Sequence, residues 1–252
     1  MLKRRIIPIQ LLVDGRLVKT QGFGAYRDVG DPVASSRVYN AQNADELVFL
    51  NIHRDARGID PLLPLLERVS EVCFMPLALG GGIRTLRDAE VLIRNGADKV
   101  VVNSMAYRDP QLLGAIAEKF GAQAVVASID VRRQDGGWTP CSDCGRKRED
   151  VALLDHVARV IAAGAGEILL NSIDRDGTMT GYDVPLIASV VRASTIPVIG
   201  CGGAGHYEHM REAFVEAGVQ ALACGSLFNF GDNNPIRAKA HLSNHGLSFK
   251  VV

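Results

Sequence analysis

The sequence lacks the features of a secreted, membrane-spanning or polyanion-binding protein. Only five cysteines occur in 252 residues, without the spacing of a secreted disulfide framework, so we expect a reducing, cytoplasmic setting. No apolar run approaches the roughly 20 residues needed to cross a bilayer. The 28 basic and 28 acidic residues balance to a net charge of +0, which gives no electrostatic case for nucleic acid or an anionic membrane as a partner.

The composition that remains is that of an ordinary globular protein. Hydrophobic residues make up 47% of the chain and charged residues 22%. A length of 252 residues is close to that of a typical (β/α)₈ barrel, about 250 residues, and is sufficient to bury a large core.

The chain repeats itself at a half-chain interval. The stretch PLALGGGIR at 76–84 is echoed by PVIGCGGAG at 197–205, and ELVFLNI at 46–52 is echoed by EILLNSI at 167–173, in both cases 121 positions later. Such a period favours two like halves that close one structure. Two doubly wound domains are the alternative, but no linker separates the halves, so we predict one barrel domain over 1–252.

Apolar strands and amphipathic helices alternate along the whole chain. The predicted strands cover residues 5–13, 46–52, 76–84, 98–103, 123–131, 167–172, 196–201 and 220–225. The predicted helices begin near 31 and 109 or cover residues 60–72, 86–95, 150–163, 185–193, 206–217 and 235–245. Eight of each predict an α/β fold, a single (β/α)₈ TIM barrel with a twofold half-barrel repeat.

Three features of the loop face suggest a site for an anionic substrate. Strands that end in glycine let a ligand approach the backbone, and exposed N–H groups there favour an anion such as phosphate. Asp130 interrupts an apolar strand near its carboxyl end, where a barrel enzyme keeps acid–base groups, although a structural aspartate is the alternative. Lys19 lies in a loop after the first strand and offers a charge to the substrate, unless it is simply solvated.

Cys141 and Cys144 form the one Cys-x-x-Cys pair. Such a pair can be half of a zinc site, a redox couple or two unremarkable thiols. A zinc site needs two further ligands, and Cys201 and Cys224 at two strand ends are the candidates that the sequence offers. We otherwise expect no metal and no cofactor.

The ordered motifs of the chain resemble those of a known family, the cyclase subunit of imidazole glycerol phosphate synthase. The resemblance covers essentially the whole chain. It rests on DGR at 14–16 with Lys19, DELVF at 45–49, GGGIR at 80–84, GADK at 96–99, GAGEILL at 164–170, DRDGT at 174–178 and GGAG at 202–205.

The resemblance implies roles for individual residues. It implies one phosphate site at Gly82, Asn103 and Ser104, and a second at Asp176, Gly177, Gly203, Gly225 and Ser226. It implies a glutaminase partner on the amino-terminal face of the barrel, with ammonia entering past a gate of four charged residues: Arg5, Glu46, Lys99 and Glu167. Asp98, beside this gate, matches a residue that contacts the glutaminase.

Two positions depart from the family pattern. The resemblance implies a pair of catalytic carboxylates, of which Asp130 is present, whereas the other falls on Leu11. Strand two ends in Asn51 where the family usually has aspartate. A leucine cannot transfer a proton, so we expect a divergent subunit that adds ammonia to another acceptor, with sugar amidation for surface polysaccharide and a sugar-activating amidotransferase as a further partner. A genuine cyclase of histidine biosynthesis and a non-catalytic ammonia conduit are the alternatives.

Overall fold

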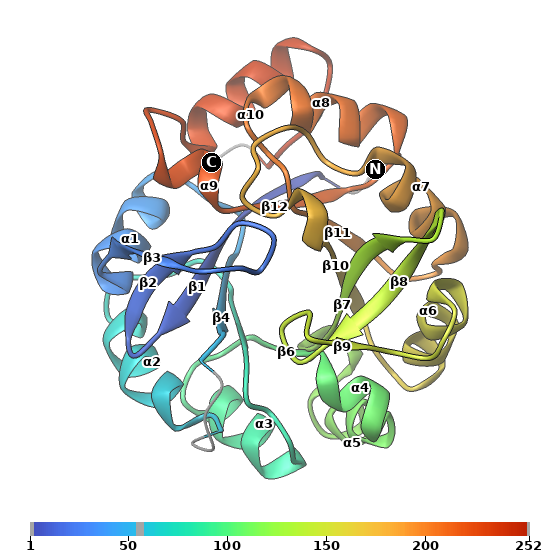
Figure 1. Cartoon of the computed structure of the whole chain (residues 1–252). Coiled ribbons are helices and arrows are strands. Elements are labelled where there is room, and N and C mark those ends of the chain that lie inside the picture. The colour runs from blue at the N-terminus through green and yellow to red at the C-terminus, as the bar shows by residue number, and fades with distance from the viewer. Residues whose placement is uncertain (1–2, 54–57, 251–252) are drawn as a thin grey trace.

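The computed structural model describes residues 3–53 and 58–250, and its centre is a closed barrel of eight parallel strands (Figure 1). The barrel strands are β1 (Arg5–Val13), β4 (Leu47–Asn51), β5 (Leu77–Gly80), β6 (Lys99–Val102), β7 (Val125–Gln134), β10 (Glu167–Ser172), β11 (Val198–Cys201) and β12 (Ala221–Cys224). Neighbours pair in chain order, β12 pairs with β1, and β7 pairs with β10. The predicted (β/α)₈ barrel is therefore confirmed.

Helices surround the barrel because each crossover between parallel strands needs one. The helices between consecutive barrel strands are α1 (Pro32–Ala41), α2 (Leu63–Ser70), α3 (Leu86–Arg94), α5 (Gln111–Phe120), α6 (Leu153–Ala162), α7 (Val184–Ala193) and α8 (Tyr207–Glu216), with α10 (Pro235–Asn244) after the last strand. Asp31, near which the sequence predicts the start of a helix, caps α1 by accepting a hydrogen bond from the Ala34 amide at 2.8 Å. Over the described residues, no helix is both long and apolar enough to span a membrane.

The structure also contains elements that the sequence did not predict. A hairpin of β2 (Arg16–Lys19) and β3 (Arg27–Gly30) extends β1, and a hairpin of β8 (Gly137–Ser142) and β9 (Lys147–Arg148) extends β7. Two short helices, α4 (Ser104–Arg108) and α9 (Ser226–Asn229), follow β6 and β12. Each pair occupies equivalent places in the two halves, which supports the twofold repeat.

Alternate residues of each strand face the inside of the barrel. These inner side chains form a separate apolar cluster, distinct from the larger core between the sheet and the helices: Ile7, Ile9, Val48, Ala78, Val101, Val126, Leu169, Ile199, Cys201, Ala221 and Ala223. The same spacing places Arg5 two residues before Ile7, and Asp130 four residues after Val126. The inward-facing side chains thus extend from the amino-terminal end of the barrel, at Arg5, to its carboxyl-terminal end, at Asp130.

Candidate active site

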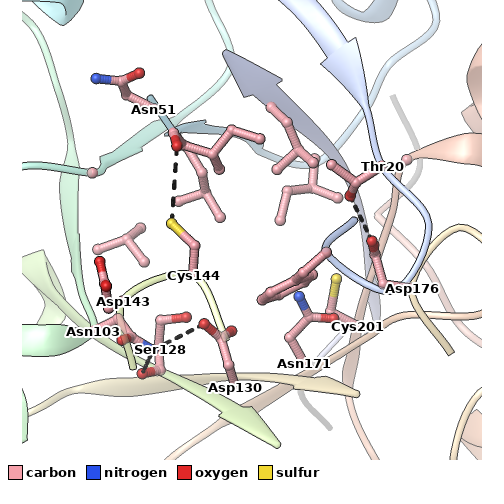
Figure 2. A pocket seen from close by; sticks show the side chains of 18 of the residues that line it. Thr20, Asn51, Asn103, Ser128, Asp130, Asp143, Cys144, Asn171, Asp176 and Cys201 are labelled. Carbon is pink, nitrogen blue, oxygen red and sulfur yellow. Dashed lines mark hydrogen bonds between the residues drawn. The ribbon is translucent and has the colours of Figure 1, made fainter. Parts of the chain in front are cut away.

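A cavity of about 890 Å³ lies at the carboxyl ends of the barrel strands (Figure 2). Its walls contain every residue that the sequence analysis assigned to acid–base chemistry or to anion binding: Lys19, Gly82, Asn103, Ser104, Asp130, Asp176, Gly177, Gly203, Gly225 and Ser226. Residues from both halves of the chain therefore meet in one site. The face is the one on which barrel enzymes carry their active sites.

Asp130 is a buried carboxylate in the wall of this cavity. It is 9% exposed, and burial, with a smaller contribution from the charge of Asp176, raises its pKa to about 7. The Asn103 amide donates to the Asp130 Oδ2 at 3.1 Å and to the Ser128 carbonyl at 3.0 Å (Figure 2). Asn103 thus orients the acid, a contact that sequence reasoning missed when it assigned Asn103 to a phosphate.

The first half of the chain has two apolar residues at the positions that correspond to Asp130 and Asn171. Leu11 pairs with Leu50 between β1 and β4, and the residues at the corresponding positions of the second half, Asp130 and Asn171, pair between β7 and β10. Leu11 and Leu50 both line the cavity. At this pair of positions the pocket is therefore apolar in one half and polar in the other, and Asp130 has no carboxylate at the equivalent position of the other half.

Asn171 adds an unsatisfied polar group to the polar wall. Its side chain is 6% exposed, and its Oδ1 has no hydrogen-bond partner among the described residues. A buried amide oxygen without a partner loses the free energy of a hydrogen bond, which a ligand N–H or O–H group can restore. Its signal in the sequence was a polar residue at the end of an apolar strand.

The first glycine-ended strand supplies a backbone surface. Gly81 and Gly82 have φ of +96° and +85°, a region that side chains rarely adopt. A Cβ on Gly82 would overlap the carbonyl of Gly58. The close approach of these two backbones therefore requires glycine, and Ser104, whose Oγ accepts from the Asp143 amide at 3.1 Å, lies in the same cavity.

The second glycine-ended strand has the same construction. Gly203 has φ +106°, and a Cβ there would overlap the carbonyl of Gly181. Gly177, at φ +68°, lies against the carbonyl of Thr20, whose hydroxyl donates to the Asp176 carboxylate at 2.7 Å (Figure 2). The loop after β1 is therefore held against the loop after β10.

Lys19 is not a solvated loop residue. It is 6% exposed, its Nζ donates to the Ile9 carbonyl at 2.8 Å, and a Cβ on Gly225 would overlap that nitrogen. Burial lowers its pKa to about 8, against the opposing charge of Asp176. An ammonium group so held faces the cavity beside the second glycine site, which agrees with a role in binding an anionic substrate.

Over the described residues, the structure does not gather the cysteines that the sequence offered as zinc ligands into a group of three or more ligands. In the part of the chain that the structure describes, no three cysteine, histidine or acidic ligand atoms that include a cysteine lie close enough to hold an ion. Cys144 points into the cavity from the β8–β9 turn, with its Sγ 3.9 Å from the Ile52 carbonyl (Figure 2). Cys141 lies in β8, where it pairs with Asp130 of β7. Burial raises the pKa of the Cys141, Cys201 and Cys224 thiols.

Four charged side chains close the other end of the barrel. Arg5 binds Glu46 at 2.9 Å and also binds Glu167, while the Lys99 Nζ donates to Glu46 at 2.7 Å and to Glu167 at 2.8 Å. The two carboxylates are only 3% and 6% exposed and the two cations are partly buried, so the four predicted gate residues form one ring of alternating charge. Burial raises the pKa of Glu46, whereas Arg5 and Lys99 outweigh burial and lower that of Glu167.

Asp98 lies immediately before Lys99, at the rim of this end. Its side chain is exposed, and its Oδ2 accepts a hydrogen bond from the Leu77 amide at 2.8 Å. It therefore orders the start of β5 in addition to presenting a negative charge at the surface.

A closed barrel whose glycine-ended strands from both halves line one cavity, with a buried acid in its wall, is the arrangement of a barrel enzyme. The family described as "Histidine biosynthesis protein" matches residues 5–234. The imidazole glycerol phosphate synthase subunit HisF of Hyphomonas neptunium is 45% identical over 252 residues, 100% of both chains. The protein of that name in two strains of Caulobacter vibrioides is 44% identical over 253 residues, 100% of this chain and 97% of the relative. The chain therefore belongs to the histidine biosynthesis protein family, as a HisF-like subunit.

Proposed function

We propose that the chain is the synthase subunit of a glutamine amidotransferase, which adds ammonia to a phosphate-bearing acceptor to form imidazole glycerol phosphate. The observation that carries the proposal is the inward row of side chains, with a ring of four charges at one end and the cavity at the other. The name of the HisF relatives, which are 44–45% identical over the whole chain, supports this reaction.

The interior between the two ends suits neutral ammonia. The inner cluster that follows the ring is apolar, with Ile7, Val48, Val101 and Leu169 one step beyond the four charged residues. Ammonium would lose its hydration there, at a high free-energy cost, whereas ammonia loses much less. At the entrance, the charged groups of the ring can take up the proton that ammonium loses when it becomes ammonia. The glutaminase binds the surrounding face and contacts Asp98.

The cavity suits an acceptor with a phosphate at each end. Each half contributes a glycine-ended strand that lines the cavity, and Lys19 supplies a positive charge beside the second. Between them Asp130, with its pKa near 7, can both donate and accept a proton at neutral pH. The Asn171 Oδ1, which has no hydrogen-bond partner in the part of the chain that the structure describes, can accept a hydrogen bond from the incoming nitrogen or from an acceptor hydroxyl.

The comparisons do not support the expectation of sugar amidation, and the relatives favour its alternative, the histidine-pathway reaction. One observation still favours a different acceptor as the second candidate. The apolar pair of Leu11 and Leu50 faces the cavity, so Asp130 must perform any acid–base step without a second carboxylate at Leu11. General acid–base catalysis typically contributes 10²–10⁴-fold. A sugar acceptor delivered by a sugar-activating amidotransferase belongs to this second candidate.

The test is turnover of the bisphosphorylated ribulosyl intermediate of the histidine pathway by the purified chain. Ammonium sulfate and glutamine with the glutaminase serve as alternative nitrogen sources. Formation of imidazole glycerol phosphate with both sources supports the proposal. No product from either source refutes it, and consumption of glutamine with a sugar acceptor then favours the second candidate. A complex that binds glutaminase but turns over no acceptor indicates a conduit.

Leu11→Asp tests the missing carboxylate directly. If the reaction is the proposed one, and Asp130 performs it alone, the variant should form imidazole glycerol phosphate roughly 10-fold faster or more with ammonium. Leu50→Asp is the matched control, because Leu50 pairs with Leu11 in the same wall but matches Asn171 in the repeat. Equal gains in both variants would contradict a specific role for a carboxylate at position 11.

A further inference from the structure

A second group of ligand-type side chains lies outside the barrel, on the last two helices. It consists of Glu208 in the first turn of α8 and of His241 and His245 at the end of α10, which pack side by side (Figure 1). One ligand atom from each of the three lies within 4.8 Å of the others. His241 and His245 are four residues apart, so a helix places them one above the other on one face.

The hydrogen bonds of the three residues leave one potential metal-ligating atom of each available. His245 Nδ1 lies 2.9 Å from the His241 carbonyl, so Nδ1 carries the proton and the lone pair is on Nε2. His241 Nε2 is buried, has no hydrogen-bond partner among the described residues, and lies 4.0 Å from Glu208 Oε2. Arg211 binds the other oxygen of Glu208, Oε1, at 2.5 Å.

We propose that Glu208, His241 and His245 form a binding site for a zinc-like divalent transition-metal ion. Two imidazole nitrogens and one carboxylate oxygen form a zinc donor set, and water can complete a tetrahedron. Metal–ligand distances of about 2.0–2.2 Å put tetrahedral ligand atoms roughly 3.4 Å apart. The three atoms must therefore approach by about 1.4 Å or less, which rotation of partly exposed side chains provides.

The surroundings set the strength and the effect of the site. The Arg211 guanidinium opposes a cation, but it occupies only Oε1 and holds the carboxylate in place. A bound ion links α8 to α10, and α8 follows the glycine loop at 202–205. Because the ion binds only the folded chain, it raises the melting temperature without touching the cavity.

The experiment uses the whole chain, freed of metal with a chelator and titrated with ZnCl₂ by calorimetry and with CoCl₂ by visible absorption. We expect one ion per chain, a tetrahedral cobalt spectrum and a higher melting temperature with zinc. His245→Ala, at an exposed position, and Glu208→Gln should each weaken zinc binding roughly 10-fold or more. Arg211→Ala, which removes the opposing charge, should strengthen it.

The matched control is His206→Ala. His206 is the N-cap residue of α8, and its ring lies against that of His209, tilted by 35° with ring centroids 3.5 Å apart, so this pair is the competing location for an ion. Unchanged zinc affinity in His206→Ala, with loss in the other two variants, supports the proposal. The proposal is overturned if the chain binds no zinc at 100 µM, a concentration at which a site of micromolar affinity is saturated. It is also overturned if His206→Ala weakens zinc binding as much as His245→Ala does, or if His245→Ala and Glu208→Gln bind zinc like the unmodified chain.

Discussion

Replacing Asp130 by asparagine should stabilise the fold at pH 8 while removing the acid. Burial raises the pKa of this carboxylate from its ordinary value of 3.8 to about 7. The native chain therefore retains a proton that the unfolded chain releases between these values, and the unfolding free energy falls as the pH rises from about 4 to 7. At about 1.4 kcal/mol per pH unit, the upper limit of this loss is about 4 kcal/mol.

The expected difference is smaller than this limit because two features moderate it. The cavity admits water to one side of the carboxylate, and Asn103 donates to Oδ2 at 3.1 Å, which favours the charged form. We therefore expect the unfolding free energy of Asp130→Asn to exceed that of the unmodified chain by about 2–3 kcal/mol at pH 8 and by less than about 1 kcal/mol at pH 4.5.

The assay is urea denaturation of both chains at several pH values from 4.5 to 8.5. Subtracting the unfolding free energy of one chain from that of the other at each pH isolates the contribution of Asp130 from those of the remaining titrating groups. Asp135→Asn is the matched control, because this side chain is 77% exposed in the hairpin beyond β7 and should show no pH-dependent difference. A difference for Asp130→Asn that is independent of pH, or a variant less stable at pH 8, would refute the reasoning.

Three further predictions concern stability. Lys99→Met should lower the unfolding free energy by about 3 kcal/mol or more, because two buried carboxylates lose a partner, whereas Lys119→Met, in a surface pair, should cost less than about 1 kcal/mol in the same denaturation assay. Gly82→Ala should destabilise the chain more than Gly136→Ala and weaken phosphate binding measured by calorimetry, since both have positive φ but only Gly82 meets another backbone. His156→Phe should be more stable than the unmodified chain, and by more at pH 5 than at pH 8. Burial lowers the His156 pKa to about 4, so the unfolded chain takes up a proton before the native chain does as the pH falls. An equal difference in unfolding free energy at both pH values would contradict this.

The barrel was predictable because its signals are local and repeated. Glycine-ended apolar strands recur at a half-chain interval, and the period-2 pattern puts Arg5 and Leu11 on one face of one strand. The repeat also identified Leu11, 119 positions earlier, as the counterpart of Asp130, and both residues line the cavity. The sites follow from strand ends, which parallel topology must bring together.

The two hairpins and several contacts were not predictable from local pattern. The β8–β9 turn uses left-handed backbone at Asp143 and Cys144, with φ of 51° and 53°, positions that glycine or asparagine would ordinarily mark. The bond between Thr20 and Asp176 joins residues 156 positions apart, and its existence depends on how two loops fold over the cavity. The burial of Lys19 depends on the same packing, so sequence reasoning could only weigh it against a solvated lysine.

The antiparallel extension of β7 changes what kind of residue Asp130 is. It pairs with Asn171 of β10 on one side and with Cys141 of β8 on the other, so its backbone lies within a sheet, although its side chain stands at the mouth of the barrel. The hairpin therefore supports the backbone of Asp130, and the strand and the hairpin should be exchanged together between relatives. A chimera that imports a relative's hairpin without the strand before it would reset the backbone under the carboxylate. A graft intended to change the acceptor should carry residues 125–149 as one block.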